Sequence, residues 1–119
     1  SPKETKPVIA AVDAASIERN KIVDAKPDQT TGVRYIAGCG QRVCETNIAI
    51  VNPVSLTRCA PDEVGEVWVS DPSMAQGYWQ RTEETKETFQ AYLQDTNEGP
   101  FLRTGDLGFL KDGELFITG

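Results

Sequence analysis

The side chains of this sequence that could do chemistry are few, and the run Arg103-Thr-Gly-Asp106 places several of them together. The carboxylate of Asp106 has two oxygens that can accept hydrogen bonds from two vicinal hydroxyl groups. Such charge-assisted hydrogen bonds are stronger than neutral ones. The structural alternative is that Asp106 caps the turn after Gly105, and that Arg103 pairs with one of the neighbouring acids. Residue types alone favour this alternative.

Three cysteines, Cys39, Cys44 and Cys59, are the other reactive side chains, and the sequence has no histidine. The spacing C-x4-C-x14-C fits no common zinc template, and a fourth ligand would have to be a carboxylate. Reduced, mostly buried thiols in a cytosolic protein are the favoured interpretation, with a Cys39–Cys44 disulfide as the open alternative. The lack of histidine excludes Ser-His-Asp and Cys-His catalysis, HExxH metalloenzymes and His-ligated zinc.

The charge is unevenly distributed along the 119 residues, which carry 12 Lys and Arg against 18 Asp and Glu, a net charge of −6. Residues 1–61 have a net charge of +2 and residues 62–119 one of −8. A solvated acidic surface is the simpler explanation, and a cation-binding patch is the alternative. The acidic balance argues against a nucleic-acid partner, and the lack of a long apolar run predicts no membrane span.

Short strands must position Asp106, and the sequence predicts most of them. Alternating or β-branched runs bounded by turn residues indicate three strands before it, at residues 33–37, 45–51 and 64–70. The second run alternates as a half-buried strand does. Glycines mark expected irregularities: Gly38 and Gly40 break the first strand, and Gly65 is a candidate bulge in the third.

A β-hairpin is expected directly after Asp106. Asp112-Gly113 lies between two apolar segments, and both positions of such a turn favour positive φ. The segments 107–110 and 114–117 are therefore predicted to pair. A strand that begins at Phe101-Leu102 leads into them.

Two helices are expected beside the strands. A short one lies within residues 10–19, where Asp13 or Ser16 could cap it. A second spans residues 82–93, with an apolar stripe at its end. The sequence therefore predicts a mainly β chain with one or two short helices, of the α+β class. The first residues, Ser-Pro-Lys-Glu, do not form a signal peptide, and without an initiator Met the chain is expected to be a piece of a longer protein.

Two ordered motifs point to a known family. Gly65-Glu66 on a strand leads to Gly77-Tyr78-Trp79, and Arg103-Thr-Gly-Asp106-Leu107 follows after the expected helix. This order resembles the adenylate-forming superfamily, which includes acyl-CoA synthetases, luciferases and adenylation domains of non-ribosomal peptide synthetases. Further segments are similar to its fatty-acyl-AMP ligase branch: Cys39-Gly-Gln41, Ile50-Val-Asn-Pro53 and Asp112-Gly-Glu-Leu-Phe116. The resemblance covers about residues 17–119. Asp71 departs from it, since the branch often has Gly there.

The resemblance implies a fold, namely the distorted β-barrel that forms the third subdomain of a larger enzyme. Residues 1–30 are then an entry segment with a short helix, and residues 31–119 are a β-barrel-like subdomain that ends just before the hinge. The family's triphosphate loop, its Mg²⁺-binding glutamate motif and its adenylation lysine are not in this sequence. The fragment alone is therefore expected to be inactive.

The resemblance also implies nucleotide-binding residues. Asp106 would accept hydrogen bonds from both ribose hydroxyls of ATP or of the acyl-adenylate. Gly105 would let the backbone pass close to the nucleotide, and Thr104 would flank it. Ile117 would line the nucleotide site or, with equal weight, belong to the barrel core. The resemblance places no catalytic residue and no metal ligand in this segment.

By the same resemblance, the full-length enzyme would use ATP and Mg²⁺ to activate a fatty acid as acyl-AMP. It would then pass the acyl group to the phosphopantetheine thiol of an acyl carrier protein, in the cytoplasm, in lipid metabolism or in polyketide or lipopeptide biosynthesis. The fragment would contact the remaining subdomains and bind no cofactor by itself. Two alternatives stay open: a non-catalytic β-module for interaction, and the same subdomain of a CoA-using acyl synthetase.

Overall fold

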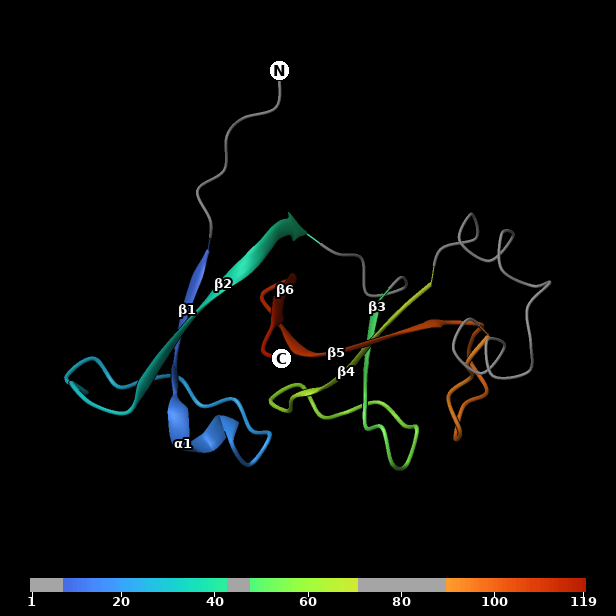
Figure 1. Cartoon of the computed structure of the whole chain (residues 1–119), viewed down its shortest axis with the longest axis horizontal. Coiled ribbons are helices and arrows are strands. Elements are labelled where there is room, and N and C mark those ends of the chain that lie inside the picture. The colour runs from blue at the N-terminus through green and yellow to red at the C-terminus, as the bar shows by residue number, and fades with distance from the viewer. Residues whose placement is uncertain (1–7, 43–47, 71–89) are drawn as a thin grey trace, which may run out of the picture.

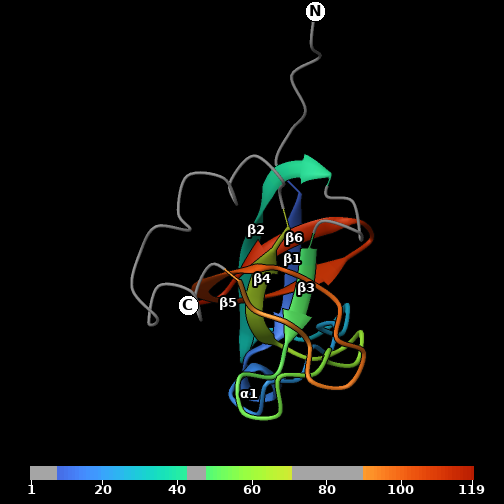
Figure 2. The same ribbon diagram turned by 90° about the vertical axis from the view of Figure 1, so that its right-hand side faces the viewer.

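The computed structural model describes residues 8–42, 48–70 and 90–119 (Figure 1). Its elements, in chain order, are β1 (Ile9–Asp13), α1 (Ala14–Ile17), β2 (Val33–Arg42), β3 (Ile48–Val51), β4 (Gly65–Val69), β5 (Leu102–Lys111) and β6 (Glu114–Ile117). The strands form one sheet in the order β1-β2-β6-β5-β4-β3, and each neighbouring pair is antiparallel. Figures 1 and 2 show the sheet curling into an open half-barrel, which confirms the predicted mainly β fold.

Buried side chains cover both faces of this sheet at β3 and β4. Val64 directly precedes β4, and Glu66 and Trp68 belong to it. Because these three residues are spaced two apart along an extended chain, their side chains lie on one face of the sheet. Two apolar clusters occupy that face, one around Phe109 and Phe116 and one around Trp68. A third cluster, built from Val67 and its neighbours on β3, lies on the opposite face. Glu66 is therefore an acidic residue between two apolar clusters.

The predicted hairpin is confirmed and anchors one of these clusters. Asp112 and Gly113 have φ of 52° and 79°, as the tight turn requires. The flanking strands pair in register, with Phe109 opposite Phe116. Their rings stack with centroids 4.9 Å apart, and both side chains are buried. The turn thereby fixes the register of β6 against β5.

Two predictions about the first half of the chain need correction. The segment predicted as helical from residue 10 starts as strand β1, and only Ala14–Ile17 is helical. Asp13 caps that turn, since its Oδ2 accepts from the Ser16 N–H at 3.1 Å. β2 spans Val33–Arg42 as one strand, so the glycines do not end it, but its register against β6 shifts between Gly38 and Arg42, in line with the irregularity predicted there. A Cβ on Gly38 would clash with the Glu114 side chain. β1 pairs with β2, so the first residues described belong to the same sheet.

Two further predictions differ from the structure. All four residues of β3 are buried, so the strand is covered on both faces rather than half-buried. Gly65 forms no bulge but pairs with Gly108, and a Cβ on it would come within 2.7 Å of the Val51 carbonyl oxygen. Close packing, not a register shift, explains this glycine.

The expected helix over residues 82–93 lies mostly outside the described residues. Its described end, from residue 90, is not helical. Ala91 instead forms an isolated antiparallel bridge with Phe101, and Leu93 is buried in the Trp68 cluster. In the part of the chain that the structure describes, no helix has the length and apolar character needed to cross a membrane.

Candidate functional site

The predicted Thr-Gly-Asp motif forms a bulge in strand β5. On either side of it the ladder is regular, with Glu66 opposite Leu107 and Trp68 opposite Arg103. Three β5 residues, Thr104, Gly105 and Asp106, therefore face the single β4 residue Val67. Gly105 has a φ of +79°, which L side chains rarely adopt. Bulges of this kind locally redirect side chains and are common beside active sites.

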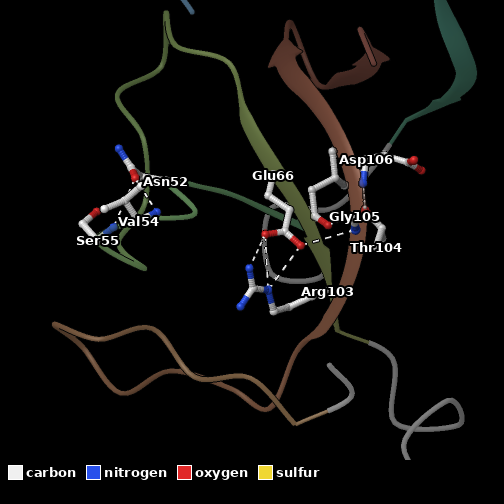
Figure 3. Close-up of polar contacts among 9 residues, drawn as sticks. Asn52, Val54, Ser55, Glu66, Arg103, Thr104, Gly105 and Asp106 are labelled. Atoms are coloured by element: carbon white, nitrogen blue, oxygen red, sulfur yellow. Dashed lines mark hydrogen bonds and ion pairs between the residues drawn. The ribbon is translucent and has the colours of Figure 1, made fainter. Parts of the chain in front are cut away.

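Side chains satisfy the backbone groups that the bulge removes from the ladder (Figure 3). The Gly105 N–H donates to Oε2 of Glu66 at 3.3 Å. The Asp106 N–H donates to Oγ1 of Thr104 at 3.1 Å, and the same hydroxyl donates to the Val67 carbonyl at 2.7 Å. Because these polar groups have partners, the bulge can keep one defined conformation.

Glu66 is the most buried polar part of this arrangement. Its side chain is 8% exposed and lies against the Arg103 guanidinium, which is 31% exposed. Arg103 donates from Nη2 to Oε1 at 2.7 Å and from Nε to both carboxylate oxygens at 3.2 Å. The guanidinium carbon also lies 5.3 Å from the ring centre of Trp68, within the range of a cation–π contact. The expected pairing of Arg103 with a local acid is confirmed.

The surroundings of Glu66 favour its charged form. Burial alone raises the pKa of this carboxyl, but the hydrogen bonds from Arg103 and the Gly105 N–H, together with the nearby Trp68 indole, outweigh burial. The pKa of Glu66 is therefore lowered from 4.5. The Trp68 Nε1 is buried and has no hydrogen-bond partner among the described residues.

Asp106 is the exposed end of the bulge. In Figure 3 its carboxylate points away from Glu66 and Arg103. The alternative prediction is that the Asp106 carboxylate caps this turn. In the structure the Gly105 N–H donates to Glu66 and the Asp106 N–H donates to Thr104, so neither amide uses the Asp106 carboxylate. Within the described residues, no side chain or backbone group forms a hydrogen bond with the Asp106 carboxylate.

Ile117 lies on the neighbouring strand. It pairs with Gly108 at the end of β6, and 36% of its surface is exposed. The chain then continues beside Leu107, whose N–H donates to the Gly119 carbonyl at 2.9 Å. The structure thus places the end of β6 next to the residue that follows Asp106. The core position on β6 belongs to Phe116, which is 1% exposed.

Glu66 is the site residue that sequence reasoning did not assign. It was noted only as part of the Gly65-Glu66 motif. The available signal was its position between Val64 and Trp68, where a strand that alternates apolar residues has an acid on the apolar face. Such an acid needs a cationic partner, and Arg103 was the basic residue of the nearby motif.

The described cysteines do not form a metal site. Cys39 is exposed and Cys59 half-buried, both as free thiols, which corrects the prediction of mostly buried thiols for Cys39. Burial raises the pKa of the Cys59 thiol. Cys59 lines a cavity of about 370 Å³ that also contacts Leu110 and Asp112 but none of the bulge residues. Cys44, Tyr78 and Trp79 lie outside the described residues, as does Asp71.

Comparison with known proteins links this chain to large ligases. It is 55% identical over 112 residues to the medium-chain-fatty-acid–[acyl-carrier-protein] ligase JamA of Moorena producens, across 93% of the chain and 19% of JamA. It is 46% identical over 78 residues to the long-chain-fatty-acid–AMP ligase FadD26 of Mycobacterium tuberculosis, across 62% of the chain and 13% of FadD26. No protein-family model matches the chain.

A solved structure shows the same arrangement of strands. The fatty acyl-adenylate ligase from Legionella pneumophila, in complex with acyl adenylate and pyrophosphate, superposes with a TM-score of 0.79 and 32% identity. The match covers 97% of the present chain and 19% of that protein. The match thus spans about a fifth of the length of JamA and of the Legionella ligase, and 13% of FadD26. The chain matches a segment of the adenylate-forming enzymes, in their fatty-acyl-AMP ligase branch, as its motifs predicted.

Proposed function

We propose that this chain supplies the ribose-binding carboxylate of an ATP-dependent fatty-acyl-AMP ligase. One observation carries the proposal: a braced bulge presents the exposed Asp106, in a chain 55% identical to a fatty-acid ligase. Two vicinal ribose hydroxyls would donate to the two oxygens of that carboxylate. Gly105 leaves the approach open, since nothing lies within 4 Å of where its Cβ would be. Ile117 would contact the nucleotide from the neighbouring strand.

The complete protein would catalyse two steps. A fatty-acid carboxylate oxygen attacks the α-phosphorus of ATP, and pyrophosphate leaves. The phosphopantetheine thiol of an acyl carrier protein then attacks the acyl carbon, and AMP leaves. The contribution of this segment is positioning: it would hold the ribose so that the α-phosphate meets the attacking carboxylate. The similarity to JamA, named for its acyl-carrier-protein substrate, supports the proposed acceptor.

Mg²⁺ is the usual partner of ATP, but the described residues do not offer it a site. No three Cys, His, Asp or Glu side chains gather as metal ligands within residues 8–42, 48–70 and 90–119. Among the described acidic residues of the second half, Glu66 is buried, whereas the others are half-buried or exposed. We therefore assign no metal-dependent step to this segment.

A cytoplasmic location and a role in lipid, polyketide or lipopeptide biosynthesis belong to the same proposal.

The test compares two Asp→Asn variants of the complete protein. Asp106→Asn should raise the KM for ATP and lower kcat/KM roughly 10–100-fold, because a neutral amide cannot accept both hydroxyls as a carboxylate does. Asp112→Asn, an exposed position with φ of 52° that Asn also tolerates, is the matched control. Pyrophosphate release with fatty acid and ATP is the readout. Equal activity of both variants would assign Asp106 a structural role.

The same assay separates the alternative functions. Transfer of the acyl group to a carrier-protein thiol supports the proposed ligase. Transfer to CoA alone would identify a CoA-using acyl synthetase. A complete protein that releases no pyrophosphate with any fatty acid would favour a non-catalytic β-module.

A further inference from the structure

Glu66 is a buried acid that the packing of the sheet does not require. It lies between the Phe109–Phe116 cluster and the Trp68 cluster, on a face that is otherwise apolar. An isolated carboxylate at such a position is unfavourable unless it is paired and hydrogen-bonded. An apolar residue there would pack at least as well. The acid therefore has a use other than core packing.

The hydrogen bonds of Glu66 indicate that use. The two carboxylate oxygens together accept three hydrogen bonds from Arg103. Oε2 also accepts a hydrogen bond from the Gly105 N–H at 3.3 Å. Gly105 directly precedes Asp106. Arg103 directly precedes Thr104, whose hydroxyl accepts from the Asp106 N–H. Glu66 thus binds the residue directly before the bulge and the middle residue of the bulge, and it forms no hydrogen bond with the Asp106 carboxylate itself.

We propose that the Glu66–Arg103 pair is a positioning clamp that sets the direction of Asp106 and thereby the recognition of the ribose. This inference rests on the proposed function of Asp106. The clamp holds the Thr104–Gly105 peptide by the Gly105 N–H, and it holds Arg103, the residue directly before the bulge. Loss of either contact frees the bulge while leaving Asp106 chemically unchanged. The clamp touches no reacting atom, so it affects binding of the sugar rather than the chemical step.

The test uses the complete protein and two nucleotides, ATP and 2′-deoxy-ATP. Wild type should prefer ATP roughly 10–100-fold in kcat/KM, because one carboxylate–hydroxyl bond is lost with the deoxy sugar. Glu66→Gln should bring this preference close to unity by raising the KM for ATP, with a smaller effect on 2′-deoxy-ATP. A merely structural role would lower the active fraction and reduce both rates equally, leaving the preference unchanged.

Glu63→Gln is the matched control. The Glu63 carboxylate also pairs with a cation, Lys21 at 2.8 Å, and also accepts a backbone N–H, from Ala60 at 2.9 Å. Glu63 lies before β4, four residues along the chain from Val67, which faces the bulge. This variant should keep the wild-type preference for ATP. Arg103→Lys keeps the positive charge but loses the fork of donors, so it should give an intermediate preference. It carries the test if Glu66→Gln does not fold.

Asp106→Asn distinguishes the failure of this inference from the failure of the proposed function. If Asp106→Asn abolishes the preference for ATP but folded Glu66→Gln and Arg103→Lys keep it, the clamp is refuted and the ribose site stands. If Asp106→Asn also keeps the preference, the ribose site itself is refuted. In the double variant with Asp106→Asn, Glu66→Gln should have little additional effect, because its influence passes through Asp106. Fully additive effects would contradict the clamp.

Discussion

At the scale of single residues, the balance between burial and pairing at Glu66 determines the behaviour of the site. Its carboxylate loses hydration, yet hydrogen bonds from a guanidinium and a backbone amide keep it charged. A pair of this kind adds little net stability compared with apolar packing, but loss of one partner is costly. The sequence retains an ion pair where a hydrophobic pair would also fold, and the bulge beside it supplies the reason.

Acid titration should reveal the charged state of Glu66. Its pKa is lowered on folding, so its contribution to stability is present above about pH 4.5 and is lost as the pH falls through the folded pKa. The free energy of unfolding of the chain should therefore fall as the pH is lowered below about 4.5. Glu66→Gln should be about 2 kcal/mol less stable at neutral pH and should show a shallower decline. Urea unfolding monitored by Trp fluorescence measures both effects.

The control for this titration is Glu98→Gln, which removes an exposed carboxylate paired with Arg58 at 3.2 Å. Surface pairs of this kind contribute little, so its unfolding curve should run parallel to that of the wild type. A decline for Glu66→Gln as steep as that of the wild type would show that another group dominates the acid response. Asp13 and Glu63, whose pKa values are also lowered by hydrogen bonds, are the candidates.

At the scale of elements, the β4–β5 ladder combines a close-packed part with an open bulge, and two glycines mark the difference. A Cβ on Gly65 would lie 2.6 Å from Cys59 Sγ and 2.7 Å from the Val51 carbonyl oxygen. A Cβ on Gly105 would meet nothing within 4 Å, but its φ of +79° disfavours any side chain. Gly65 is thus required by space and Gly105 by backbone conformation.

Alanine substitutions should separate these two requirements. Gly105→Ala should cost about 1–2 kcal/mol, the typical penalty of a left-handed conformation for a residue with a Cβ. Gly65→Ala should cost more, about 3 kcal/mol, because a backbone carbonyl must move to admit the methyl group. Denaturant unfolding of the two variants gives the comparison. If Gly65→Ala proves the milder change, the close packing between β4 and β3 is not as described.

Sequence patterns predicted the elements that depend on local signals. The Asp112-Gly113 turn specifies its own backbone, so the hairpin was predicted correctly. Tertiary contacts decided the rest. The alternation predicts a half-buried β3, but packing on both faces buries all of it. β2 continues past Gly38 because it pairs with β1 and β6, with a register shift against β6 after Gly38. The start of the chain, rich in Ala, became strand β1 because β2 offered it a partner.

The site was predictable in part for the same reason. The residues around Asp106 form one continuous motif, and the motif led to the nucleotide-binding prediction. Glu66 is 37 residues from Arg103 in sequence, and their contact depends on the register of β4 and β5. That register includes a three-against-one bulge, which no local pattern reveals. The ribose contact of Asp106, Gly105, Thr104 and Ile117 stays a prediction until the variants are measured.

At the scale of the whole molecule, the half-barrel buries both faces of its sheet at β3 and β4, and the Asp106 carboxylate lies on one exposed bulge. The relatives that it matches are about five times longer, since the chain covers 19% of JamA. A ribose contact alone leaves the triphosphate and the fatty acid without groups to position them. By the proposed function, the described segment would orient the nucleotide, and the chemistry would require other parts of such an enzyme.

The 119-residue chain by itself should accordingly release no pyrophosphate from ATP and a medium- or long-chain fatty acid. The assay is the one used for the complete protein, with far-UV circular dichroism showing that the chain retains its β structure. The complete protein in the same buffer is the positive control. Measurable turnover by the isolated chain, abolished by Asp106→Asn, would show that the catalytic groups lie within it.

The bulge has a further consequence for how such a site can arise. It adds two residues to β5 relative to β4, so the inside–outside alternation of side chains is the same before and after it. An insertion of one residue would move the side chains at one end of the strand to the opposite face. It would thereby expose either Phe109 or Phe101, which packs in the Trp68 cluster. A gain or loss of two residues, by contrast, changes only the bulge that carries the Asp106 carboxylate. One such two-residue change in evolution would therefore add or remove the proposed ribose contact of Asp106, while the barrel around it keeps the same core.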